Sequence, residues 1–262
     1  MMPEEQEYQA HGVFSELDRY VAFYESLARS VFQFPTMGTK AICNIDSYVF
    51  SSIEGTLTSI RSILRDGRIN DAYALLRKYY DSAIITIYSN LYLEEHVSIE
   101  NLIVRQIDDW LKGKKRLPEY RVMSEYIRKS QKVAPITQLL FADECYKRLR
   151  DRCNDHTHYN FYLNVLLNDP RIHLPSRVAA LDDFAKDVRD VVILHAAYLF
   201  FAKQHYMASS DFIDSLECGF TPVADSQYWV APFVQDLFDE VIVQHRADIA
   251  ATIKKHTSMH LK

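Results

Sequence analysis

The densest group of side chains able to do chemistry lies in residues 150–158, which read RDRCNDHTH. Arginine carries a permanent charge on a planar fork that fits a phosphate group. Histidine titrates near neutral pH and can move a proton. Cleavage of an RNA phosphodiester by its own 2′-hydroxyl needs a base, an acid and a cation for the developing charge. The segment supplies these groups, and that reaction needs no metal ion.

The spacing of the arginines and histidines sets a geometric condition. Arg152 and His156 are four residues apart and share one face of a continuous helix. Arg150 and His156 are six residues apart, which separates them by about 240° at ~100° per residue. They converge only if the helix breaks between them. Asn154 or Asp155 could provide that break as the N-cap of a new helix.

A structural role for the segment is open beside the catalytic one. Arginine and histidine near a helix junction often bind carbonyl groups or pair with acids, and Asp151 and Asp155 are near in sequence. A metal site made by His156 and His158 fits poorly, because side chains two residues apart on a helix point ~200° apart. The chain also lacks the GxGxxG, GxxxxGK[ST], GxSxG and HExxH motifs. We therefore expect neither a metal ion nor a cofactor.

Hydrophobic residues recur at helical spacing along most of the chain, and no run alternates as in a strand. Glycine and proline are scarce, at 6 and 8 of 262 residues. Gly67 is a natural helix end and Asn70 a natural N-cap, which predicts a tight turn over 66–70. The fold class is therefore all-α, a bundle of long antiparallel helices. Helices are predicted near 15–32, 45–66, 70–94, 136–153, 177–207 and 230–255, with two shorter ones within 98–130.

Composition and charge predict the domain organisation and the cellular compartment of the protein. Residues 1–13 are polar and predict a loose N-terminal arm, and residues 14–262 a single helical domain, since no Gly/Ser linker interrupts them. The net charge of −5 argues against non-specific nucleic-acid binding over the whole surface. Four cysteines without a CxxC pair indicate reduced thiols in a cytoplasmic protein. The longest apolar run, 191–202, is too short to span a membrane.

The Arg–His segment resembles the motif of the HEPN superfamily of helical domains, many of which carry an R-x(4–6)-H motif with a polar residue after the arginine. Arg150, Asp151 and His156 fit this pattern. Arg152 and His158 have the same spacing, so two registers are open. Residues 67–81 look like the A-x-x-L-x-R-x-x-x-E helix of bacterial HEPN-like families, with aspartate where glutamate is usual. The likeness covers about residues 44–205.

The resemblance implies a metal-independent endoribonuclease that acts as a homodimer with its two motifs facing each other, in toxin–antitoxin or phage-defence systems. Carried over to this chain, His156 would be the acid/base, Arg150 the phosphate-binding cation, and Asp151 the residue that orients one of them. Asn154 would support them. The implied partners are RNA and a protein partner or antitoxin. Because many HEPN-like proteins have lost catalysis, the open alternative is an inactive helical module that binds a protein partner or a nucleotide.

Three further features each have two interpretations. Arg77 and Asp81 form an i, i+4 pair, either an ordinary helix ion pair or a brace for the Arg–His segment. His195 lies on an apolar face and indicates a core histidine. The basic stretch could bind RNA phosphates or form a solvated loop, and it comprises Lys112, Lys114, Lys115 and Arg116.

Overall fold

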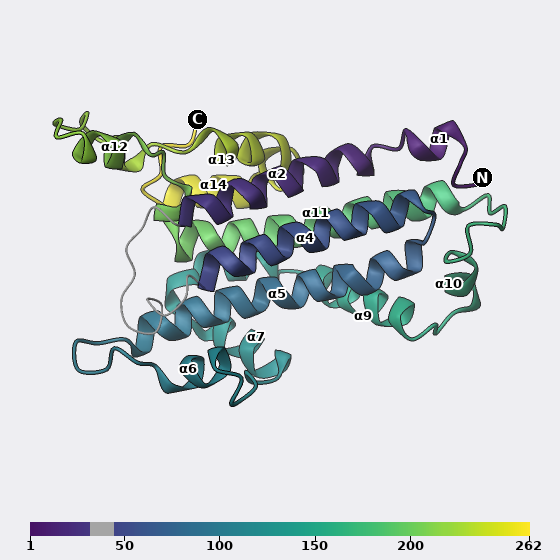
Figure 1. Cartoon of the computed structure of the whole chain (residues 1–262), viewed down its shortest axis with the longest axis horizontal. Coiled ribbons are helices and arrows are strands. Elements are labelled where there is room, and N and C mark those ends of the chain that lie inside the picture. The colour runs from purple at the N-terminus through teal and green to yellow at the C-terminus, as the bar shows by residue number, and fades with distance from the viewer. Residues whose placement is uncertain (32–44) are drawn as a thin grey trace. The chain divides into compact units, whose positions relative to one another are not determined.

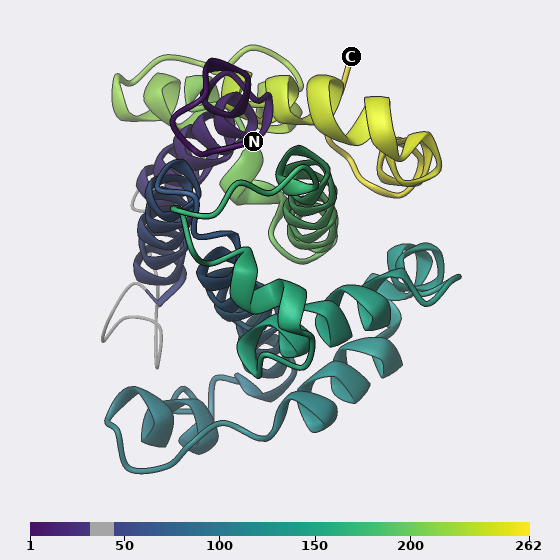
Figure 2. The same cartoon turned by 90° about the vertical axis from the view of Figure 1, so that its right-hand side faces the viewer.

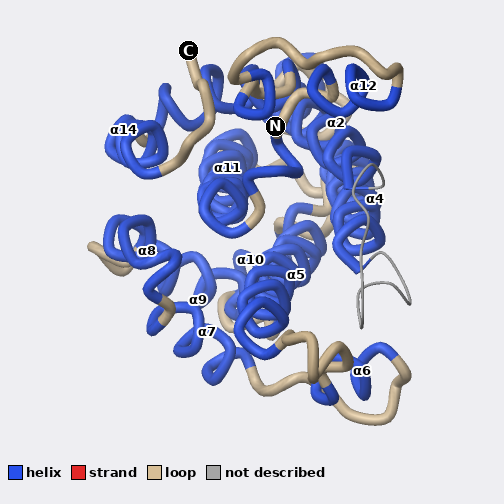
Figure 3. The backbone as a smooth tube through the Cα atoms, turned by 90° about the vertical axis from the view of Figure 1, so that its left-hand side faces the viewer, coloured by secondary structure: helices blue, strands red, loops and turns tan. Residues whose placement is uncertain are grey.

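The computed structural model describes residues 1–31 and 45–262 of the chain. Within these residues the regular structure is helical, and the sole β-pairings are the isolated bridges Ala208–Val230 and Trp229–His260 (Figure 3). The prediction of an all-α fold is confirmed. Cys43 and the predicted helix end at Phe32 lie outside the described residues.

Four long helices correspond to predicted ones: α2 (Val13–Val31), α4 (Ile45–Arg65), α5 (Ile69–His96) and α11 (Arg177–Ala202). The last of them ends before the predicted position 207, because a short 3-10 helix occupies Gln204–Met207. The two short helices predicted on either side of the basic stretch are α6 (Arg105–Leu111) and α7 (Tyr120–Lys129). The remaining helices are α1 (Gln6–Gln9), α8 (Ala134–Leu140), α9 (Cys145–Thr157), α10 (Tyr162–Leu166), α12 (Asp211–Glu217), α13 (Pro232–Leu237) and α14 (Ala247–His256).

The predicted turn between α4 and α5 is confirmed. Gly67 has a φ of 78°, and the backbone N–H of Arg68 donates to the carbonyl oxygen of Ile63 at 3.1 Å. This left-handed residue with its 6→1 hydrogen bond is the usual way to end a helix at glycine. The predicted N-cap at Asn70 is wrong, because α5 already begins at Ile69. The Asn70 side chain is buried instead, and its contact with α9 is described below.

Two predicted helices are interrupted. The helix predicted over 136–153 is α8 and α9, because the Asp143 side chain accepts the backbone N–H of Cys145 at 2.8 Å and so competes with the helical pattern. The last helix, predicted over 230–255, stops at Arg246, whose φ of −144° and ψ of 68° are not helical. There the guanidinium folds back onto Asp248, with Nη2 2.7 Å from Oδ2.

Contacts within the chain form two compact units, where one helical domain was predicted. Unit 1 comprises Met1–Glu25, Tyr48–Ala83 and Asp143–Val192, and unit 2 comprises Ser26–Ser47, Ile84–Ala142 and Ile193–Lys262. Helices α2, α4, α5 and α11 each contribute residues to both units (Figure 1).

The first thirteen residues belong to unit 1 and are not a loose arm. Tyr8 is fully buried, and its hydroxyl donates to the Leu64 carbonyl oxygen at 2.6 Å. The Gln9 amide also donates to the Arg65 carbonyl at 2.9 Å. The prediction of a loose arm relied on the polar composition of this segment and overlooked its one aromatic ring. Burial of that ring stabilises the packing of the segment against the rest of unit 1.

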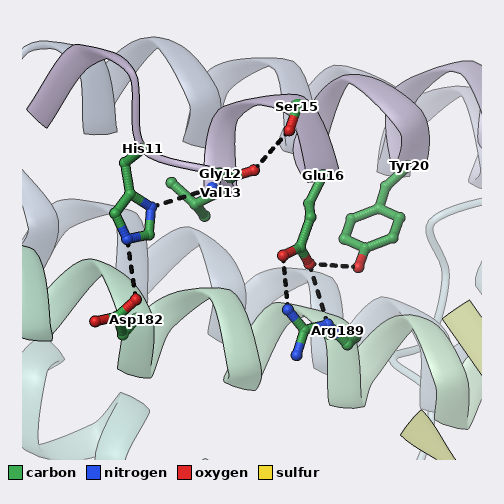
Figure 4. A network of polar contacts seen from close by, with 8 residues as sticks. All are labelled: His11, Gly12, Val13, Ser15, Glu16, Tyr20, Asp182 and Arg189. Carbon is green, nitrogen blue, oxygen red and sulfur yellow. Dashed lines mark hydrogen bonds and ion pairs between the residues drawn. The ribbon is translucent and has the colours of Figure 1, made fainter. Parts of the chain in front are cut away.

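An ion-pair network joins α2 to α11 within unit 1 (Figure 4). The Glu16 carboxylate accepts Nη2 of Arg189 at 2.6 Å and Nε at 3.1 Å, and it also accepts the Tyr20 hydroxyl at 2.9 Å. Glu16 and Arg189 are about one-fifth exposed. Nearby, His11 lies 3.1 Å from Asp182, whose side chain is 70% exposed.

Unit 2 has a buried polar group of its own. Asp46 accepts the Asn90 amide at 2.9 Å and the Tyr206 hydroxyl at 2.6 Å. His195 is completely buried, and that burial lowers its pKa to about 3. The expectation that His195 is a core histidine is confirmed.

Candidate functional site

Helix α9 carries the Arg–His segment without a break as far as Thr157. The break that Asn154 or Asp155 could have provided is absent from α9, so the helical geometry keeps Arg150 and His156 on different faces. The face that α9 buries carries Leu149, Cys153 and His156. Within unit 1, His156 of α9 contacts α5 and Arg152 of α9 contacts α11, and Figures 1 and 2 draw the ribbons of these helices.

His156 is held on two sides by α5. Its Nδ1 lies 2.9 Å from Oδ1 of Asn70, and its ring stacks on Tyr73 with centroids 3.9 Å apart and planes 10° from parallel. The side chain is only 7% exposed. Burial, aided by the positive charge of Arg152, lowers the pKa of His156 to about 4. The imidazole is therefore neutral at pH 7, and the tautomer that donates Nδ1–H to the Asn70 oxygen has its lone pair on Nε2.

Arg152 forms a two-pronged ion pair with α11. Its Nε lies 2.6 Å from Oδ2 of Asp187 and its Nη2 lies 3.1 Å from Oδ1. The Tyr73 hydroxyl donates to the same Asp187 carboxylate at 3.2 Å. Burial raises the pKa of the Asp187 carboxyl, and the Arg152 guanidinium opposes that rise. Arg152, whose side chain is 43% exposed, thus uses the fork that could bind a phosphate to neutralise a carboxylate that is almost fully buried.

The predicted pair on α5 is confirmed and reaches α9. Arg77 Nε lies 3.0 Å from Oδ2 of Asp81, and Arg77 Nη1 donates to the Asn154 side-chain oxygen. The Arg77 side chain is 19% exposed. A half-buried arginine that joins two helices acts as a brace, which was one of the two interpretations from the sequence.

The remaining residues of the two predicted registers lie outside this buried cluster. Arg150 is half-buried, whereas Asp151 and His158 are exposed. His158 is the residue that ends α9, and it is followed by Tyr159 with a φ of 50°. The structure therefore does not bring Arg150 to His156, nor Arg152 to His158. The pair that it does bring onto one face is Arg152 and His156.

Three residues of this cluster were not anticipated as site residues: Asn70, Tyr73 and Asp187. Asn70 was interpreted as a cap, and Tyr73 is an ordinary member of an apolar helix. Asp187 could have been recognised from the sequence, because it is an acidic residue three positions after Phe184 on the apolar face of α11. An acid at such a position requires a cation from a neighbouring helix.

The basic stretch lies in unit 2, in the turn after α6. Lys112 Nζ is 2.7 Å from Oδ2 of Asp108, so this lysine is already paired. The other three basic side chains of the stretch are exposed: Lys114, Lys115 and Arg116.

Metal-binding groups and membrane-spanning helices were sought throughout residues 1–31 and 45–262. In that part of the chain no three His, Cys, Asp or Glu side chains are grouped closely enough to hold a metal ion. None of the helices there is both long and apolar enough to span a bilayer.

Comparisons with known proteins place the chain in no family. No protein-family model matches it, and no curated protein or solved structure is significantly similar to it. The HEPN-like character of the bundle stays a prediction from the Arg–His motif and the helix at 67–81.

Proposed function

We propose that this protein is a catalytically inactive, HEPN-like helical module that binds a protein partner, and that this partner is a second copy of the chain. The observation that carries the proposal is that protein groups of unit 1 already contact the Arg152 and His156 side chains. Asp187 occupies both prongs of Arg152, and Asn70 and Tyr73 hold His156. These contacts stabilise the packing of α9 and engage both side chains with protein groups, although Arg152 is 43% exposed.

The properties of His156 also favour a structural role. A general base is most effective when its pKa lies near the working pH. Burial lowers the pKa of His156 to about 4, so its lone pair is only weakly basic at pH 7. With 7% of the residue exposed, the ring has little room to reach a ribose hydroxyl.

The surface that follows α9 supports a binding role. Within seven residues it exposes five large apolar side chains, of which Tyr162 is 75% and Phe161 60% exposed. Contiguous exposed apolar groups mark interaction sites, and tyrosine is enriched at protein interfaces. A second copy of the chain is the favoured partner because symmetric homodimers are the commonest assemblies and the resemblance implies one. The patch consists of Tyr159, Phe161, Tyr162, Leu163 and Val165.

The test is the oligomeric state of the full chain at micromolar concentration, measured by light scattering after gel filtration. The wild-type protein should be a dimer, and the double variant Phe161→Ser/Tyr162→Ser a monomer with an unchanged helical spectrum. A matched control is Leu216→Ser/Phe220→Ser, which removes equally exposed apolar groups from unit 2 and should leave the dimer intact. A monomeric wild-type protein, or a double variant at 161 and 162 that still dimerises, would contradict the proposal.

The metal-independent endoribonuclease is a second candidate, because Asp151 on α9 and His158 directly after it are exposed, and His158 immediately precedes the apolar patch in the sequence. A dimer formed through that patch would place two copies of the segment near each other. Cleavage of RNA in the presence of EDTA, with products ending in 2′,3′-cyclic phosphate, would support this candidate. His156→Ala should then lower the rate by ~10²–10⁴, the usual contribution of a general acid or base.

One variant at half-buried Arg150 and one at exposed His158 separate the two registers, with circular dichroism as the check that each variant is folded. Arg150→Ala would abolish cleavage if Arg150 and His156 form the motif. His158→Ala would abolish it if Arg152 and His158 do. The inactive-module proposal expects no cleavage above background in the wild-type protein and therefore no effect of either substitution.

A further inference from the structure

Unit 2 contains a pocket of about 630 Å³ beside the basic stretch. Its apolar side is formed by Ile85, Trp110 and Met123, and its basic side by Lys114, Lys115 and Arg116. A volume of this size is within the ~300–1,000 Å³ that small-molecule sites occupy. An aromatic side chain beside clustered cations suits a ligand that carries both a flat ring and negative charge.

The end of α6 positions the basic side chains next to the indole ring. Gly113 adopts a φ of 66°, which lets the chain reverse directly after the helix. The backbone N–H groups of Lys114 and Lys115 then both donate to the carbonyl oxygen of Asp109, at 2.8 and 3.2 Å. Because the turn folds back onto its own helix, the basic residues stay beside Trp110.

The acids of α6 pair with some of these cations and leave others available. Lys112 Nζ is 2.7 Å from Asp108, and Lys115 Nζ is 3.9 Å from Asp109. Within the described residues, Lys114 and Arg116 have no hydrogen-bond or ion-pair partner for their side chains, and both are exposed. Two unpaired cations at the edge of an apolar pocket attract an anion that carries more than one negative charge.

We infer that this pocket binds a nucleotide, with the base against Trp110 and the phosphate between Lys114 and Arg116. Bases stack on aromatic side chains because each base has a flat π-face, and this contact does not depend on sequence. The arginine fork and the lysine ammonium suit a phosphate, which carries up to two charges. The inference uses residues of unit 2 alone and does not depend on the proposed protein-binding function.

The nucleotide can be free in solution or part of a single RNA strand, and a fluorescence titration distinguishes these sources. The chain has two tryptophans, so Trp229→Phe leaves Trp110 as the sole one. Adding AMP or a single-stranded adenosine hexamer to the full-length variant should quench its emission in a saturable way. Tighter binding of the hexamer than of AMP assigns the site to RNA, and equal or weaker binding of the hexamer assigns it to the free nucleotide.

The charge requirement is tested by calorimetric titration of variants in the wild-type background. Lys114→Gln/Arg116→Gln should weaken binding by ~tenfold or more, since both phosphate contacts are lost. Lys112→Gln is the matched control, because Asp108 already holds that lysine, and it should change the affinity less than about twofold. Trp110→Leu keeps the pocket apolar but removes stacking, and should weaken binding by roughly fivefold or more.

Two results would overturn the inference. One is the absence of saturable binding of both AMP and the hexamer at millimolar concentration. The other is an equal loss of affinity in the double variant at 114 and 116 and in the Lys112 control. That result would mean that binding depends on the overall surface charge and not on Lys114 and Arg116 in particular.

Discussion

The neutral, buried state of His156 predicts a specific pH dependence of stability. Its pKa is about 6.5 when the chain is unfolded and about 4 in the folded protein, because burial and Arg152 both oppose its charge. The unfolded chain therefore binds the proton more tightly. The free energy of unfolding falls as the pH falls through 6.5 and stops falling below about 4.

The size of this effect follows from the shift in pKa. The difference of about 2.5 pKa units corresponds to about 3 kcal/mol over the full range, at ~1.4 kcal/mol per unit. Between pH 7 and pH 5 the same relation gives a loss of about 2 kcal/mol. A glutamine at position 156 keeps an amide that can bond to Asn70 but cannot titrate.

Urea unfolding at pH 7, 6 and 5, followed by circular dichroism, measures the difference. Between pH 7 and pH 5 the wild-type protein should lose about 2 kcal/mol more stability than His156→Gln. Comparing the two proteins cancels the contribution of His195, which both contain. His158→Gln, which removes an exposed imidazole outside the buried cluster, is the matched control for the substitution itself. Parallel profiles for wild type and His156→Gln would refute the assignment of His156 as a buried neutral histidine.

Two further predictions compare matched pairs by urea unfolding at pH 7. Glu16→Gln should cost about 1–2 kcal/mol because it weakens a shielded network with Arg189, whereas Asp182→Asn removes an exposed partner and should cost less than about 0.5 kcal/mol. Equal costs would mean that burial does not decide the strength of these pairs. Gly67→Ala should cost about 2–3 kcal/mol and Gly113→Ala about 1 kcal/mol, since both need positive φ but an added Cβ at Gly67 would lie 2.3 Å from a proline carbon. A cheaper Gly67→Ala would contradict the close approach of the N-terminal segment.

The long helices were predictable because their signal is repeated over many residues. In α4 and α5 the apolar positions recur every three or four residues for five turns or more, so single exceptions do not matter. The interruptions were not predictable in the same way. The gap before α9 depends on one hydrogen bond, which the backbone N–H of Cys145 donates to the Asp143 side chain. The packing of residues 1–13 depends on one buried ring, that of Tyr8.

The partners in the candidate site were harder to predict than its members. The sequence drew attention to Arg152 and His156 by their type and density. Their partners Asn70 and Asp187 come from helices that are distant in the sequence, and only the packing of α5 and α11 against α9 brings them together. Spacing along one helix constrains which side chains share a face, but it contains no information on which side chains another helix will present.

The two candidate functions differ in what they require of the last turn of α9. A phosphate can contact both Arg150 and His156 only if that turn unwinds, because a continuous helix separates them by about 240°. Unwinding breaks the Asn70 hydrogen bond, worth about 1 kcal/mol, and the Tyr73 stack, worth about 0.5–1.5 kcal/mol. Together these contacts keep the unwound form roughly 10- to 70-fold rarer than it would be without them.

Substitution of Asn70 therefore separates the candidates. Asn70→Ala removes the hydrogen bond that holds His156 and should make the unwound form roughly fivefold more populated. If the protein is a ribonuclease that acts from this form, Asn70→Ala should cut RNA several times faster than wild type, although it is less stable. If the protein is an inactive module, Asn70→Ala should lose about 1–2 kcal/mol of stability and show no cleavage. Faster cleavage by the less stable variant would reject the inactive module, because the loss of a purely structural hydrogen bond lowers stability but does not increase a catalytic rate.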